Sequence, residues 1–151
     1  MEKIYYSWND ISNLIKNNIE PIKKYNPDFI IAIGGGGLIP ARLLRNYINK
    51  PIYVVTLSLY NDEIIGDKVN IIQWININLK DKKVLIIDEI DDTRKTMEFC
   101  VKELIEKNKA NNMCVFVLHN KIKYKLGVLE NINYHSCQNI DDKWVVYPWD
   151  L

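Results

Sequence analysis

The residues best suited to chemistry lie in one short segment, VLIIDEIDDTRKT, from Val84 to Thr96. Four apolar residues bring Asp88 and Glu89 to the end of an expected strand. Adjacent carboxylates can accept hydrogen bonds from a vicinal diol, such as that of a ribose, or hold Mg²⁺ through oxygen ligands. Four acids within five residues repel one another unless cations or donors meet them. The segment therefore indicates a ligand site rather than an ordinary acidic helix start.

The same segment also offers a place for a phosphate. Thr93 and Thr96 lie at the expected start of a helix. There, hydroxyls and unpaired backbone N–H groups can hold a phosphate monoester. A diol site next to a phosphate site suits ribose 5-phosphate.

A second unusual turn consists of four consecutive glycines, Gly34 to Gly37, after the apolar run Phe29–Ile33. Consecutive glycines lose much backbone entropy on folding, and this turn opens an expected helix whose N-terminus favours an anion. It matches neither GxGxxG, which needs glycine where Ile39 stands, nor the P-loop, which ends in Gly-Lys-Ser/Thr. We interpret it as a phosphate or pyrophosphate cradle of another kind; a tight strand–helix turn is the alternative.

Alternating strands and helices are expected to position both turns. This alternation predicts an α/β fold, a mostly parallel sheet flanked by helices, with ligands beyond the carboxyl ends of its strands. The pattern is less regular from Ser58 to about Lys82, and the aromatic tail 143–150 is expected to be irregular. Apolar patterns predict strands over 29–33, 51–57, 84–87, 115–118 and 132–137, and helices over 11–22 (with an N-cap in 7–10 and an end at Pro21 and Pro27), 38–48 and 97–105.

Length and composition exclude several classes of protein. The 151 residues, 48% of them hydrophobic, suit one domain that needs no disulfide or metal for stability. The net charge of +1 gives no basic field, so no nucleic-acid partner is expected. No apolar run approaches the ~18 residues of a membrane span, and the N-terminus lacks a signal-peptide core. Three cysteines, Cys100, Cys114 and Cys137, match no zinc spacing and indicate reduced thiols in a cytoplasmic compartment.

On these motifs, the chain resembles the type I phosphoribosyltransferases, and most closely the fungal-type hypoxanthine-guanine and xanthine enzymes. Val84–Thr96 looks like the motif that binds phosphoribosyl pyrophosphate (PRPP), and Ile30–Leu44 looks like the pyrophosphate loop with its helix. Leu57–Asp62 resembles the start of the mobile loop, and Lys143–Asp150 resembles the base-binding hood. The resemblance implies one domain over residues 1–151, with a core over about 25–137 and a hood formed by about 138–151 with the N-terminal segment.

The resemblance also implies a reaction: a 6-oxopurine and PRPP give a nucleoside 5′-monophosphate and pyrophosphate, with Mg²⁺ as cofactor. Asp92 aligns with the acid–base carboxylate that handles the purine N7 proton, and Asp88 and Glu89 would hold the ribose hydroxyls and Mg²⁺. A homodimer or homotetramer is expected. The implied 5′-phosphate loop is Asp91, Asp92, Thr93, Arg94, Lys95 and Thr96, and the implied pyrophosphate loop is Gly35, Gly36 and Gly37, within which a strained or cis peptide is plausible.

For the base, the resemblance implies that Lys121 donates to the 6-oxo group, with Lys123 and Lys125 as competitors. Trp144 would stack on the purine and the Val145 carbonyl would read its edge. Asp150 is assigned to the base and, with Asp88 and Glu89, to the metal. Ser58, Leu59 and Tyr60 would begin a mobile loop that excludes water; His119 and His135 are expected to be structural.

Two departures from the family pattern stand out. Arg94 replaces the commoner glycine, so its side chain is expected to point away from the phosphate or to donate to it. Gly35 stands where many relatives carry a basic residue, which leaves Arg42 or Lys95 as helpers for pyrophosphate. A PRPP-sensing or RNA-binding regulator on the same fold, or a transferase for another base, remains an alternative, and the preferred purine stays open.

Overall fold

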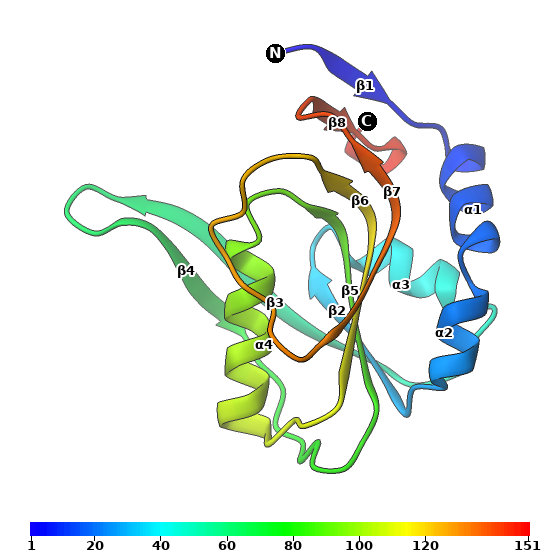
Figure 1. Cartoon of the computed structure of the whole chain (residues 1–151), viewed down its shortest axis with the longest axis vertical. Helices are drawn as coiled ribbons and strands as arrows, with labels where there is room; N and C mark the ends of the chain where they lie inside the picture. The colour runs from blue at the N-terminus through cyan, green and yellow to red at the C-terminus, as the bar shows by residue number, and fades with distance from the viewer.

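The chain folds around one six-stranded sheet whose strands follow the order β4-β3-β2-β5-β6-β7 (Figure 1). A computed structural model describes residues 1–151, apart from the side chain of Asp67. Every neighbouring pair is parallel except β3 and β4. The predicted α/β architecture is therefore confirmed. The strands are β2 (Phe29–Gly34), β3 (Ile52–Asp62), β4 (Gly66–Gln73), β5 (Val84–Asp91), β6 (Met113–Lys121) and β7 (Asn133–Ile140).

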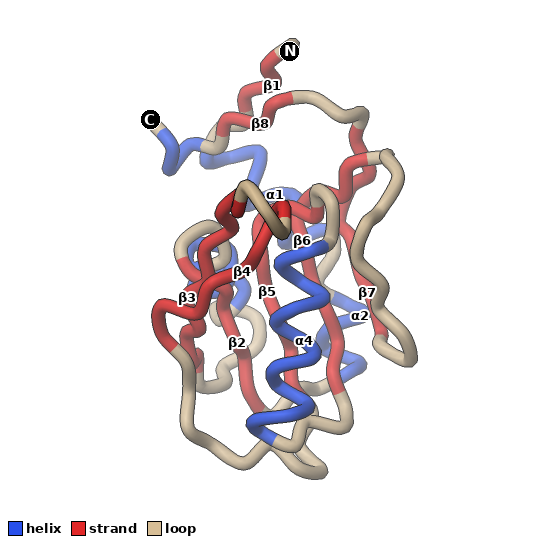
Figure 2. Tube along the Cα trace, turned by 90° about the vertical axis from the view of Figure 1, so that its left-hand side faces the viewer, coloured by secondary structure: helices blue, strands red, loops and turns tan.

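Helices cover both faces of the sheet, as Figures 1 and 2 show. Strand residues alternate between two apolar cores: Ile30 and Ala32 pack in one, and Ile31 and Ile33 in the other. No helix among the described residues is long and apolar enough to cross a membrane. The first core is closed by α1 (Trp8–Asn17), α2 (Glu20–Tyr25) and α3 (Leu38–Leu44), and the second by α4 (Lys95–Asn108).

The N-terminal helical segment differs from the single helix predicted over 11–22. It begins as expected, with a capping box in which Ser7 and Asp10 bond each other's backbone N–H. Pro21, however, lies in the first turn of a second helix, α2. Proline lacks an N–H but is tolerated in a first turn, so it starts this helix rather than ending the previous one.

The part of the sequence with the less regular pattern forms regular strands as far as Gln73. Ser58, Leu59 and Tyr60 continue β3 and pair with Asn70, Val69 and Lys68 of β4. The two strands form a hairpin that projects from the body of the molecule (Figure 1). Its residues are mostly exposed, so the apolar pattern that marks a buried strand is absent from this part of the sequence.

The aromatic tail is also more regular than predicted. β8 (Trp144–Val146) pairs in parallel with β1 (Lys3–Tyr5), and a 3₁₀ turn (Pro148–Asp150) follows. The pairing partner lies at the other end of the chain, so no local pattern announces it. The two short strands and the termini lie together beyond the carboxyl ends of the main sheet (Figure 1).

Candidate active site

A cavity of about 180 Å³ opens where β5 runs into α4. Because β2, β5 and β6 are parallel, the glycine turn, the acidic segment and Lys121 all lie at the same edge of the sheet. This is where ligands of such sheets bind. The cavity is lined by Leu59, Asp88, Glu89, Ile90, Asp91, Asp92, Thr93, Arg94, Thr96 and Met97.

Asp88 and Glu89 form the acidic floor of this cavity. Asp88 is almost completely buried, and its Oδ1 accepts the Glu89 backbone N–H at 2.9 Å. Burial, and then the neighbouring charge of Glu89, raise the pKa of Asp88 well above its usual range. Burial likewise raises the pKa of Glu89. Two desolvated carboxyl groups side by side favour a ligand that brings hydroxyl donors or positive charge.

The glycine turn packs directly against these acids. A Cβ at Gly36 would collide with the Glu89 carboxylate, and one at Gly37 would meet the Ile87 and Ile33 carbonyls. Gly35 faces open space, so only its neighbours require glycine for close approach. The Gly34–Gly35 peptide is cis, in line with the sequence expectation. The Arg42 guanidinium donates to the side-chain carbonyl of Asn46, just after α3, and not to the glycine turn.

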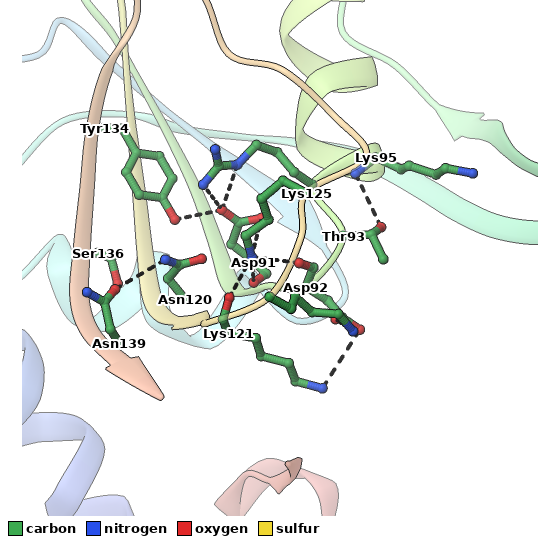
Figure 3. Close-up of polar contacts among 12 residues, drawn as sticks. Asp91, Asp92, Thr93, Lys95, Asn120, Lys121, Lys125, Tyr134, Ser136 and Asn139 are labelled. Atoms are coloured by element: carbon green, nitrogen blue, oxygen red, sulfur yellow. Dashed lines mark hydrogen bonds and ion pairs between the residues drawn. The ribbon is translucent and has the colours of Figure 1, made fainter. Parts of the chain in front are cut away.

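The predicted 5′-phosphate loop exists as a turn, but two of its side chains face inward. The Asp91 Oδ2 accepts Arg94 Nε at 2.9 Å, Arg94 Nη2 at 2.7 Å and the Tyr134 hydroxyl at 2.6 Å. The Arg94 guanidinium also lies over the Tyr134 ring, 4.8 Å from its centre. The Arg94 guanidinium is therefore engaged by Asp91 and Tyr134, which leaves the backbone to meet an anion in the cavity. Figure 3 shows Tyr134 reaching Asp91.

Three lysines at and just after the end of β6 have distinct partners. Lys121 ends β6 rather than following it, and its Nζ lies 3.8 Å from Asp92 and 3.5 Å from Asp142. Lys123 binds the same two carboxylates at 2.8 and 3.1 Å. The Asp92 bond raises the pKa of Lys123. Lys125 instead donates to three backbone carbonyls. Its three N–H groups are thus occupied, which removes Lys125 as a candidate base reader.

The hood residues lie on β8 and the turn after it. The Trp144 side chain is 59% exposed, so an aromatic surface is available for stacking. The backbone N–H of Trp144 donates to the Glu2 carbonyl, and the Val146 carbonyl accepts the backbone N–H of Tyr6. Both bonds are directed toward the chain around β1. Because carbonyls alternate in direction along a strand, the Val145 carbonyl points away from β1. Asp150 accepts the Tyr147 N–H at 2.9 Å and so closes the 3₁₀ turn.

Tyr147 links the hood to the acidic floor. Its hydroxyl donates to the Glu89 carbonyl at 3.1 Å and lies 2.8 Å from His119 Nδ1. Burial lowers the pKa of His119 to about 4. His135 bonds Asn18 and stacks on Phe116. Both histidines thus occupy packed positions inside the fold.

The described residues contain no group of three or more His, Cys, Asp or Glu side chains arranged for a metal. The predicted ligand set of Asp88, Glu89 and Asp150 is therefore not gathered into a ready three-ligand site. Asp150 is held as a cap, whereas Asp88 and Glu89 remain adjacent at the cavity.

The family of the chain follows from comparison with known proteins. A family model described as "Phosphoribosyl transferase domain" matches residues 3–151. The chain belongs to the phosphoribosyltransferase family. This agrees with the family resemblance found in the sequence.

Named relatives of this phosphoribosyltransferase share most of its length. Hypoxanthine-guanine phosphoribosyltransferase of Saccharomyces cerevisiae is 38% identical over 99% of the chain and 86% of the relative. Xanthine phosphoribosyltransferase 1 of the same yeast is also 38% identical, over 99% and 90%. These fungal relatives agree with the subgroup that the sequence resembles.

Solved structures with the same fold cover nearly the whole phosphoribosyltransferase chain. A hypothetical protein from Neisseria gonorrhoeae with bound ppGpp is 43% identical, with a TM-score of 0.89 over 99% of this chain and 90% of that one. A purine phosphoribosyltransferase from Pyrococcus horikoshii is 32% identical, with a TM-score of 0.83 over 100% and 95%.

Three residues to which the sequence gives no role support this site, namely Tyr134, Asp142 and Tyr147. A fourth, Lys125, is predicted only as a possible base reader and instead bonds the backbone. Tyr134 and Tyr147 carry hydroxyls that bond the acidic segment from β7 and from the hood. No local spacing could have found them, because their partners lie 43 and 58 residues away.

Proposed function

We propose that this phosphoribosyltransferase transfers the 5-phosphoribosyl group of PRPP to N9 of a 6-oxopurine, namely hypoxanthine, guanine or xanthine. The bond from ribose C1′ to pyrophosphate breaks, the bond from C1′ to N9 forms, and the purine loses one proton. The observation that carries this proposal is the cavity at β5. It joins two adjacent buried carboxyl groups to a backbone turn suited to a phosphate.

The acidic floor and the two turns would hold PRPP. Asp88 and Glu89 accept the ribose hydroxyls, and the turn 91–96 takes the 5′-phosphate through backbone N–H groups and the hydroxyls of Thr93 and Thr96. Gly35, Gly36 and Gly37 form the pyrophosphate side, which supports the proposal because Gly36 lies directly against Glu89. The hairpin at Ser58–Tyr60 would screen the cavity from water, since Leu59 already lines it.

The hood and the end of β6 would hold the purine. Trp144 stacks on its face, the Val145 carbonyl accepts from its edge and Lys121 donates to its 6-oxo group. Asp92 takes the N7 proton as C1′ bonds to N9. Its carboxylate is half-exposed and bonded to Lys123, so a purine can reach it.

Mg²⁺ fits the donor set of the acidic floor. The ion prefers oxygen ligands and commonly binds through one or two carboxylates together with substrate phosphates. Asp88 and Glu89 supply two such carboxylates side by side. When bound, Mg²⁺ would offset negative charge on PRPP and on the departing pyrophosphate. We extend the proposal to the assembly as a homodimer or homotetramer and to a cytoplasmic compartment, in keeping with three free cysteines.

The direct test mixes the protein with PRPP, Mg²⁺ and each of hypoxanthine, guanine, xanthine and adenine, and measures the monophosphate formed. A protein that makes no product with any purine would overturn the proposal. Asp92→Asn should lower kcat by about 10²–10⁴-fold while PRPP still binds. Asp141→Asn, at an exposed position nearby, is the matched control and should retain the wild-type rate.

One relative suggests a second ligand of the same site. The gonococcal structure, 43% identical to this chain, holds ppGpp, which carries a guanine base, a ribose and diphosphates. We therefore infer that guanine nucleotides of this kind compete with PRPP here. The check is inhibition by ppGpp that disappears at saturating PRPP; inhibition unaffected by PRPP would refute a shared site.

A further inference from the structure

The segment 121–127 follows β6 and packs against the turn that joins β5 to α4. At its centre is Lys125, whose side chain is only 15% exposed. Lys125 Nζ donates to the carbonyls of Asp91 at 2.9 Å, Asp92 at 2.6 Å and Lys121 at 2.9 Å. An ammonium group has three donors and no acceptor. All three donors are therefore spent on the backbone, two of them on the turn (Figure 3).

The next two residues continue the same contact. The N–H groups of Leu126 and Gly127 both donate to the Thr93 carbonyl, at 2.9 and 3.1 Å. A Cβ at Gly127 would collide with the Arg94 carbonyl, so only glycine allows the segment to approach this closely. Three successive carbonyls of the turn, from 91 to 93, are thus held by Lys125 and the two amides after it.

The direction of these carbonyls fixes the direction of the N–H groups. In a trans peptide the C=O and the N–H point to opposite sides, and the described chain has no cis bond in this turn. The N–H groups of Asp92, Thr93 and Arg94 therefore point away from the segment 125–127. That side is the cavity, which the same three residues line. Successive N–H groups that converge in this way form a concave site for an anion.

The cost of burying the Lys125 ammonium must be offset by its contacts. Charged groups are costly to bury unless they are paired and hydrogen-bonded, and burial lowers the pKa of Lys125. Asp91 offers only a distant partner, with Oδ1 3.8 Å from Nζ. Most of the compensation comes from carbonyls, so the ammonium acts on the backbone of the turn.

We propose that Lys125, with the amides of Leu126 and Gly127, is a positioning residue that aims three peptide N–H groups at the 5′-phosphate of PRPP. This inference rests on the proposed function. It separates Lys125 from Lys121 and Lys123, whose ammonium groups contact the carboxylates of Asp92 and Asp142.

The test measures direct binding of ribose 5-phosphate and of pyrophosphate by calorimetry in Mg²⁺ buffer, beside KM for PRPP and kcat. Lys125→Met keeps the length of the side chain but removes its donors. We expect the Kd for ribose 5-phosphate and KM for PRPP to rise at least tenfold, with the Kd for pyrophosphate within twofold of wild type. Lys102→Met, at an exposed ion pair on α4, is the matched control and should change none of these constants.

A second variant covers the case in which Lys125→Met does not fold. Gly127→Ala keeps the ammonium but forces the segment away from the turn, and it should produce the same selective loss. Unchanged binding of ribose 5-phosphate in a folded variant would overturn the proposal, as would equal weakening of both ligands. A wild-type protein that binds ribose 5-phosphate but makes no nucleotide would contradict the proposed function and leave the binding test of Lys125 valid.

Discussion

Replacing Arg94 with glycine, the residue common in the family motif, should destabilise this protein. Arg94 has a φ of 72°, a left-handed conformation that glycine adopts freely. Relief of that conformation is worth about 1 kcal/mol. The substitution also removes both guanidinium bonds to Asp91, at 2.7 and 2.9 Å.

The lost ion pair outweighs the relief. The side chains of Arg94 and Asp91 are 20% and 0% exposed, so the remaining carboxylate cannot turn to water. Breaking a buried pair costs about 3–5 kcal/mol. The lower end applies because Tyr134 still donates to Asp91. The net loss should be about 2 kcal/mol, which lowers Tm by about 4–8 °C in a domain of this size.

Urea denaturation followed by circular dichroism measures this difference, and Lys109→Gly is its control. Lys109 is exposed and has a φ of 58° at the end of α4. Glycine at this position should raise the free energy of unfolding by about 1 kcal/mol, because it relieves the left-handed conformation. Combining Arg94→Gly with Asp91→Asn should recover more than half of the lost free energy of unfolding, because no buried carboxylate then remains unpaired. An Arg94→Gly protein as stable as wild type, or more stable, would refute the role assigned to the ion pair.

Two further predictions concern the floor of the cavity. Gly36→Ala should lower kcat/KM for PRPP by more than about 10²-fold, because its methyl group would displace the Glu89 carboxylate. Steady-state kinetics test this against Gly35→Ala, whose methyl group meets open space and should lower kcat/KM much less. Asp88→Asn should abolish turnover yet stabilise the ligand-free protein at pH 7–8, since burial raises the pKa of Asp88. A raised carboxyl pKa favours folding below the unfolded pKa of about 4, and that contribution is lost as pH rises through the folded pKa. Thermal unfolding from pH 4 to 8 should therefore show a stability gap between Asp88→Asn and wild type that widens with pH, and a constant gap would contradict it.

Much of the core was predictable because it follows local rules. The continuous apolar runs of β2, β5 and β6 mark strands buried on both faces. The acids and the glycines each come directly after such a run. Their meeting in space then follows from parallel strands, without knowledge of any side-chain contact.

The supporting contacts were not predictable, for two physical reasons. Lys125 is one of 17 lysines, so its residue type carries little information. Its partners are backbone carbonyls 33 and 34 residues away, and carbonyls are present at every position. The sequence predicts that Arg94 avoids or binds the phosphate, whereas its actual partner is Asp91, a residue of the predicted phosphate loop. Local spacing cannot show which way either side chain turns.

The pairing of β1 with β8 affects when the hood forms during folding. The two strands have three residues each, and their paired residues, such as Lys3 and Trp144, lie 141 positions apart in the sequence. Closing so long a loop costs entropy, and only three pairs of residues offset that cost once the strands have met. This small sheet should therefore form late in folding and open first in the native state, while the core that carries the phosphate turns stays closed. Hydrogen exchange should then be fast at Val146 and slow at Ile86, so the hood proposed to hold the purine should open before the turns proposed to hold the phosphates.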